Sequence, residues 1–185
     1  EGNGDYTVVG YQQIQGDQYA ALYSEILTVE LENDFFPFLY PNQYVNFSPD
    51  SEASKLALSM VSEDTTDVDA LKQIYNYVVN NLTDVDETLS TKTGICFDYA
   101  ALTTAMLRSC DIPCKLQIGY TGDIKHAWID VYIRSKGWVT GAVSFNGDSW
   151  SLMDPTFDSS ADSDDTEAIQ DYIGNADNYT VQFTR

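Results

Sequence analysis

Three side chains of this sequence have the types and the order that covalent catalysis through a thiol requires. Cys96 lies where a helix is expected to begin, and His126 is the only histidine of the chain. Asp154 stands at the end of a short expected strand. A thiolate can attack a carbonyl carbon, an imidazole can take up and return the proton, and a carboxylate can orient the imidazole. The order of these residues therefore predicts a nucleophile, a general base and an orienting group.

The expected place of Cys96 suits this chemistry. A free thiol is mostly protonated at neutral pH, and its thiolate is stabilised by the unpaired N–H groups of a helix N-terminus or by a nearby imidazole. Gly94 allows the chain to turn tightly into the helix. The backbone N–H of Cys96 would also supply one donor to an oxyanion, whereas the spacing identifies no second donor.

Each of these residues also has a structural interpretation. A cysteine in an apolar helix usually packs in the core, a histidine before an alternating strand can lie on the surface, and Asp-Pro is a common turn. Among the neighbouring residues, Asp98 is predicted to stabilise the helix start and Asp130 to face solvent from its strand. Trp128 and Trp138 are predicted to cover the imidazole or to lie in the core.

Helical patterns come before strand patterns along the chain. Residues 48–51 begin a first helix, and Thr66 with Asp69 forms a capping-box pattern before a second, which has the clearest apolar stripe. A third helix over 96–109 is apolar on nearly every side and is predicted to be buried. Alternating patterns with intervening turns then predict strands over 115–120, 126–133, 138–143, 150–153 and 178–184. This order predicts an α+β domain with helices packed on an antiparallel sheet.

The beginning of the chain is predicted to be an extension. Residues 1–47 are expected to pack on a core domain formed by residues 48–185. Within the extension, residues 6–9 favour a short strand, and residues 17–30 place apolar side chains at the spacing of an amphipathic helix. The aromatic segment 33–47 is predicted to be a loop whose rings pack on the core.

Composition excludes several classes of function. The chain has 185 residues, 43% of them hydrophobic, which suits one globular domain. Its 29 acidic and 9 basic residues give a formal net charge of -20, which repels nucleic acids and anionic membranes. No apolar run reaches the roughly 20 residues of a membrane helix. We therefore expect no nucleic-acid partner and no membrane insertion.

The other two cysteines, Cys110 and Cys114, lie close together in the sequence. They could form a small disulfide in an oxidising compartment or remain buried thiols. Their spacing is one residue longer than the redox motif Cys-x-x-Cys, and no thioredoxin-like pattern surrounds them. A zinc site lacks a second cysteine pair, so no metal and no cofactor are expected.

The region 94–157 resembles the core of the transglutaminase-like superfamily, a papain-related group of thiol enzymes. The matching pieces are Gly-Ile-Cys-Phe-Asp-Tyr-Ala around Cys96, Met106-Leu107-Arg108, Ile112-Pro113, Gly119-Tyr120, His126-Ala127-Trp128, Trp138 and Met153-Asp154-Pro155-Thr156. The resemblance implies Cys96 as nucleophile, His126 as general base and acid, and Asp154 as the orienting carboxylate. Eukaryotic transglutaminases take an oxyanion donor from a tryptophan before the cysteine, and no tryptophan precedes Cys96 here.

This family passes an acyl group from an amide to an amine or to water, and some members have lost activity. We therefore expect a peptidase, amidase or transglutaminase acting on protein or cell-wall peptide, with a slight preference for hydrolysis. The alternative is a catalytically silent module that binds peptides in the same cleft. The chain begins with Glu1 instead of Met, and its first predicted helices resemble those of secreted bacterial members. The expected location is outside a bacterial cell or at its surface, with the signal or anchor segment absent from this chain.

Overall fold

The structure is a computed structural model that describes residues 2–81, 93–139, 143–145, 150–152 and 175–185. The chain divides into two compact units, Glu1–Pro37 and Phe38–Arg185.

The first unit is a long antiparallel hairpin of β1 (Gly4–Gln15) and β2 (Gln18–Val29). Its two-residue turn contains Gly16, whose φ of 53° lies in the left-handed region that glycine adopts without a Cβ clash. The strand predicted over 6–9 is part of β1. The helix predicted over 17–30 is wrong, because this segment is rich in Tyr, Ile, Leu and Val, and pairing with β1 along its whole length outweighs a local helical spacing.

The short helix η1 (Phe36–Phe38) spans the boundary between the two units. The described part of the second unit then has three α-helices. They are α1 (Glu52–Met60), α2 (Asp67–Asn81) and α3 (Thr93–Ser109). The Ser51 side chain caps α1 by accepting a hydrogen bond from the backbone N–H of Ser54. All three helices were predicted from the sequence, and α3 begins three residues earlier than expected.

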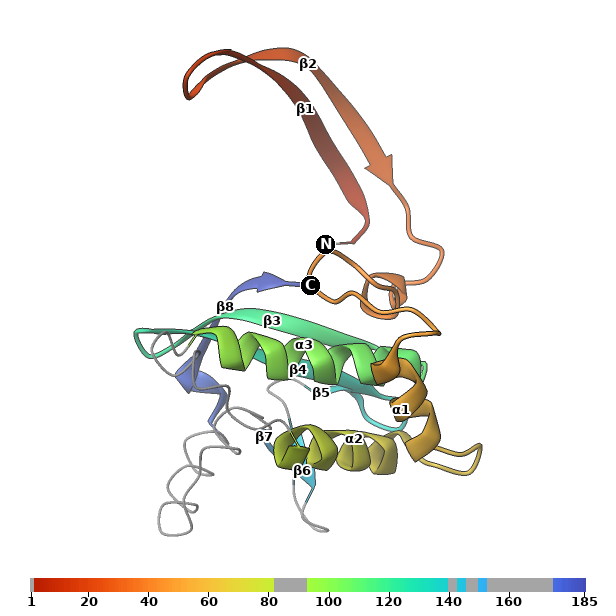
Figure 1. Cartoon of the computed structure of the whole chain (residues 1–185). Coiled ribbons are helices and arrows are strands. Elements are labelled where there is room, and N and C mark those ends of the chain that lie inside the picture. The colour runs from red at the N-terminus through yellow and green to blue at the C-terminus, as the bar shows by residue number, and fades with distance from the viewer. Residues whose placement is uncertain (1, 82–92, 140–142, 146–149, 153–174) are drawn as a thin grey trace. The chain divides into compact units, whose positions relative to one another are not determined.

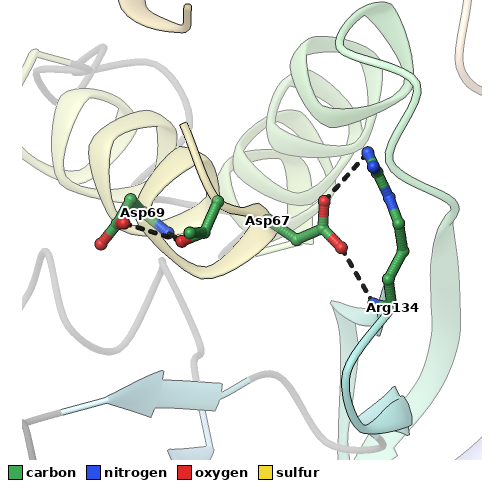
Figure 2. A network of polar contacts seen from close by, with 4 residues as sticks. Asp67, Asp69 and Arg134 are labelled. Atoms are coloured by element: carbon green, nitrogen blue, oxygen red, sulfur yellow. Dashed lines mark hydrogen bonds and ion pairs between the residues drawn. The ribbon is translucent and has the colours of Figure 1, made fainter. Parts of the chain in front are cut away.

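The start of α2 confirms that Thr66 caps this helix, with Asp69 as its partner. The Asp69 backbone N–H donates to Thr66 Oγ1 over 3.2 Å, and Thr66 Oγ1 donates to Asp69 Oδ2 over 2.7 Å. Figure 2 shows that Asp67 also binds Arg134, through the Arg134 backbone N–H at 2.9 Å and the guanidinium at 3.1 Å. The first turn of α2 is therefore tied to the chain just beyond strand β4 (Ile124–Ile133).

The main sheet has four antiparallel strands in the order β5-β4-β3-β8. The strands flanking β4 are β5 (Gly137–Val139) and β3 (Cys114–Thr121), and β8 (Tyr179–Thr184) follows the short helix η2 (Ala176–Asn178). A separate pair consists of β6 (Val143–Phe145) and β7 (Trp150–Leu152). Helices followed by antiparallel strands confirm the predicted α+β class, and Figure 1 shows α3 running along β3 and β4.

One core joins the helices to one face of this sheet. It combines apolar side chains from α2 and α3 with Cys114 and Leu116 on β3 and their cross-strand partners Val131 and Ile129 on β4. The Cys114 thiol donates to Thr104 Oγ1 on α3, which identifies this as the face that packs on α3. The buried third helix was predicted from its apolar character. Among the helices of the described residues, none is long and apolar enough to span a bilayer.

A buried arginine links the C-terminal end of α3 to the start of β3 through hydrogen bonds to backbone carbonyl oxygens. Arg108 donates to the carbonyl oxygen of Cys114 through Nε and Nη2, at 3.0 and 2.8 Å. It also donates to the carbonyl oxygens of Tyr40 at 2.8 Å and Arg185 at 3.0 Å. Burial lowers the pKa of Arg108, and the nearby Cys114 opposes this shift. These bonds hold the end of α3 against the start of β3.

Candidate functional site

Cys96 lies in the first turn of α3, as predicted. The helix begins at Thr93, and Cys96 is 2% exposed within the hydrophobic core. The first turn of a helix has backbone N–H groups without helical partners and the positive end of the helix dipole. An anionic sulfur at this position would therefore be stabilised electrostatically.

His126 lies near the beginning of β4 and is 6% exposed. Its ring is nearly parallel to that of Trp128, with an interplanar angle of 17° and centroids 6.2 Å apart. Tyr179 of β8 approaches both rings, with centroids 6.1 Å from His126 and 5.1 Å from Trp128. The imidazole is thus bordered by the rings of Trp128 and Tyr179. The position of the Trp128 ring agrees with the prediction that Trp128 covers the imidazole.

Cys96 and His126 lie at the same end of the layer formed by α3 and the sheet. Arg108 fixes the C-terminal end of α3 to Cys114, the first residue of β3. Going back from Arg108 to Cys96, the helix rises about 18 Å, and going from Cys114 to Gly119, the strand rises about 17 Å. Gly119 is paired with His126. Because α3 packs against both β3 and β4, Cys96 and His126 lie at similar distances from the end of the layer that contains Arg108 and Cys114.

The side chains of β4 form two alternating rows. Ala127, Ile129 and Val131 belong to the core shared with α3. His126, Trp128 and Asp130 form the other row, because successive side chains of a strand point to opposite faces. His126 is the first of its row, so sulfur and imidazole would have to meet around the end of the sheet.

The prediction that Asp130 faces solvent is wrong. Asp130 is 5% exposed, and its carboxylate accepts a hydrogen bond from Gln117 Nε2. Gln117 Oε1 in turn accepts from Thr184 Oγ1 over 2.7 Å. The side chains of three neighbouring strands therefore form a polar chain in the row of His126. A buried carboxylate needs such donors, and Asp130 obtains one from Gln117 on the neighbouring strand β3.

Other aromatic residues of this face surround a lysine. Trp138 contacts Phe38 and Tyr132 edge to face, and Lys115 Nζ lies 3.9 Å from the Trp138 ring centroid and 5.0 Å from that of Phe38. Trp138 therefore packs around Lys115 and Tyr132. Asp98, on α3, is exposed, which is compatible with its predicted effect on the helix start.

Cys110 and Cys114 are free thiols in environments that disfavour ionisation. Burial raises the pKa of Cys110 to about 11. Burial raises the pKa of Cys114 to about 12, although the hydrogen bond to Thr104 and the nearby Arg108 act in the opposite direction. Both thiols are therefore almost fully protonated at neutral pH and poor nucleophiles. Of the two alternatives for this pair, the structure shows the thiols.

Two features of the site were missed in the sequence. Tyr179 was predicted to lie in a strand, but its contact with His126 depends on the pairing of β8 with β3, which places Tyr179 opposite Thr121. The polar chain from Asp130 to Thr184 depends on the same pairing. Alternation in 178–184 indicated the strand, and nothing local indicated its partner.

Comparison with known proteins identifies the family. The model of the transglutaminase-like superfamily matches residues 54–155, more than half of the chain, and this segment contains all three predicted site residues. The chain belongs to the transglutaminase-like superfamily. Cys96 and His126 lie within the described residues. Asp154 lies outside the described residues.

Individual relatives of this transglutaminase-like chain are distant. Uncharacterized protein YebA of Bacillus subtilis (strain 168) is 24% identical over 153 residues, which cover 63% of the chain and 21% of YebA. The chain thus spans about a fifth of the length of that relative.

A solved structure shares its fold. A candidate cysteine protease from Cytophaga hutchinsonii aligns with a TM-score of 0.50 and 17% identity, over 98% of this chain and 70% of the other. A candidate protease from Parabacteroides distasonis aligns with a TM-score of 0.38 and 13% identity, over 75% of this chain and 38% of the other.

Within the described ranges of the transglutaminase-like chain, no three His, Cys, Asp or Glu residues gather closely enough to hold a metal ion.

Proposed function

We propose that this protein is a thiol acyl-transfer enzyme that acts on peptide amide bonds through Cys96, His126 and Asp154. The supporting observation is the common position of Cys96 and His126 at one end of the layer of α3 and β4, inside the segment matched by the superfamily. Cys96 would be the nucleophile and His126 the general base and acid. Asp154 would orient the imidazole.

The reaction follows from these roles. His126 takes the proton of Cys96, and the thiolate attacks the amide carbonyl carbon to form a tetrahedral intermediate. The backbone N–H groups in the first turn of α3, which lack partners within the helix, stabilise the oxyanion. His126 returns the proton to the leaving nitrogen, the C–N bond breaks, and a thioester with Cys96 remains. Water or an amine then attacks the thioester, and His126 receives a proton from that nucleophile and returns one to the sulfur as the C–S bond breaks.

The acceptor distinguishes the two possible products. Water gives hydrolysis, and a primary amine gives a cross-link. We propose hydrolysis of protein or cell-wall peptide outside the cell as the main reaction. The aromatic rings of Trp128 and Tyr179 support this site, because they lie beside an imidazole that is only 6% exposed.

The decisive experiment is thiol-selective labelling combined with turnover. Iodoacetamide at neutral pH should alkylate Cys96 much faster than Cys110 and Cys114, whose raised pKa values keep them protonated. A peptide library, with and without an amine acceptor, then reports hydrolysis and transfer. Cys96→Ala should abolish turnover, and the matched control Cys110→Ala should retain it.

Two outcomes would oppose the proposal. Equal, slow alkylation of all three thiols, with no turnover of any peptide, would indicate a silent peptide-binding module on the same fold. Full activity in Cys96→Ala would exclude the covalent route. Asp154→Asn provides the separate test of the third residue, and we expect it to lower kcat while the fold is retained.

A further inference from the structure

The β1–β2 hairpin of the first unit has a surface that suits binding to another polypeptide. Most of the exposed large apolar side chains in the described part of the chain belong to it. The six most exposed within the hairpin are Ile26, Ile14, Leu22, Tyr11, Tyr19 and Tyr23. They lie on both faces of the hairpin, because Tyr23 and Ile26 are three residues apart on β2 and successive side chains of a strand point to opposite faces. Such a concentration of exposed apolar groups marks an interaction site.

The hairpin also has open edges. Among the strands of the described residues, β1 and β2 pair only with each other, so each has a row of outward backbone N–H and C=O groups. Each strand has 12 residues and extends about 40 Å. Proteins commonly block such edges with proline or lysine, and residues 4–29 contain neither. An added strand therefore meets neither of these residues along the edges, and the register shifts at Gly10/Tyr11 and Gln13/Gln15 divide the regular pairing into shorter stretches.

Charge determines which strand is favoured. Residues 1–37 contain no lysine, arginine or histidine, and the first basic residue of the chain is Lys55. The acidic residues of this unit are Glu1, Asp5, Asp17, Glu25, Glu30, Glu32 and Asp34. Two such hairpins repel each other, so this charge opposes pairing between copies of the chain. The same charge attracts a segment that carries positive side chains.

We propose that the hairpin binds an extended segment of another protein that alternates basic and apolar residues and adds as a strand to one of its edges. Backbone hydrogen bonds to the open edge would supply affinity, and the carboxylates and apolar side chains would select the sequence. This binding is independent of the thiol chemistry proposed above, so each proposal can fail without the other.

The test measures binding of fluorescent ten-residue peptides to the full chain by anisotropy. The probe alternates lysine and valine, and its matched control alternates glutamate and valine. At low salt we expect the lysine peptide to bind at least about tenfold more tightly than the control, and its affinity to fall as salt increases. A lysine–valine peptide with N-methylated backbone amides should bind at least about tenfold more weakly than the unmethylated probe, because it cannot pair with an edge.

Variants locate the binding. Glu25→Gln with Glu30→Gln removes charge without changing shape, and Ile26→Thr with Leu27→Thr removes apolar surface with residues that still favour strands. Both pairs should weaken the lysine peptide several-fold, whereas Leu58→Gln, at an exposed apolar position of α1, should not. Hydrogen exchange of the β1 and β2 amides shows whether each variant retains the hairpin.

Three results would overturn the proposal. They are equal binding of both charged peptides, unchanged binding in both hairpin variants with the hairpin intact, and unchanged binding of the methylated probe. Sedimentation velocity distinguishes binding of a different protein from pairing with a second copy of this chain. If the chain forms dimers that increase with salt and exclude the peptide, the hairpin pairs with a second copy instead.

Discussion

The ring of Tyr179 lies with its centroid 6.1 Å from that of the His126 imidazole, at an interplanar angle of 40°. Tyr179 also contacts Trp128, whose ring is nearly parallel to the imidazole. The last strand of the sheet thus contributes a side chain to the environment of the proposed base. Tyr179 is a positioning residue in this arrangement, since it acts through His126.

Tyr179→Ala should lower kcat about tenfold or more, because the imidazole can then rotate away from its productive orientation. Tyr179→Phe retains the ring and should retain most of the activity. The pH profile of kcat/KM should shift in Tyr179→Ala and not in Tyr179→Phe, with thermal unfolding as the check on folding. An unchanged rate and pH profile in Tyr179→Ala would remove Tyr179 from the site.

Gly119→Ala should damage the sheet at the point nearest His126. A Cβ on Gly119 would overlap the backbone carbonyl of Thr180 on β8 and press on the Trp128 ring. The overlap with backbone cannot be relieved by a rotamer change, so we expect a loss of about 1–3 kcal/mol in the free energy of unfolding. Urea denaturation measures it. Gly2→Ala is the matched control, because a Cβ there meets nothing within 4 Å.

Arg108→Ala should be among the most destabilising substitutions in the chain. It removes the donors to the carbonyl oxygens of Cys114, Tyr40 and Arg185, of which the Arg185 oxygen still accepts from the Leu116 backbone N–H. The expected cost is about 2–4 kcal/mol, from the lost hydrogen bonds and the cavity that the side chain leaves. Arg134→Ala, which removes a guanidinium that is 72% exposed, should cost less than about 1 kcal/mol. Similar unfolding midpoints for the two variants would contradict this account.

Cys114 should make stability fall in alkaline solution. Its thiol remains protonated in the folded protein up to a pKa of about 12, whereas in the unfolded chain it ionises from an ordinary value of 9.0. The unfolded state therefore binds fewer protons between these values, and the free energy of unfolding decreases with rising pH by at most about 1.4 kcal/mol per unit.

The matched variant for this prediction is Cys114→Ala. Other groups also titrate in alkaline solution, so the informative quantity is the difference in stability between the parent and the variant. The parent's advantage should shrink as pH rises above about 9 and remain constant below about pH 8. A constant difference across the alkaline range would show that burial does not hold this thiol protonated.

Local signals in the sequence predicted much of the fold. The cap formed by Thr66 and Asp69, the burial of α3 and the place of Cys96 in its first turn depend on neighbouring residues, and the structure has all three. The errors arose where distant pairing decides the outcome. Residues 18–29 form a strand because β1 lies beside them, and Asp130 is buried with Gln117, which also binds Thr184 of the C-terminal strand. The meeting of sulfur, imidazole and carboxyl stays a prediction.

The tight turn between α3 and β3 fixes the alignment of the helix that contains Cys96 with the sheet that contains His126. Asp111 adopts a φ of 59°, and the backbone N–H of Ile112 donates to the Leu107 carbonyl, so the chain reverses within a few residues. The lengths of α3 and β3 therefore control how far Cys96 and His126 lie from this turn. Lengthening α3 by four residues displaces Cys96, and lengthening β3 by two displaces the end of the sheet near His126, each by about 6–7 Å. Making both insertions restores their alignment.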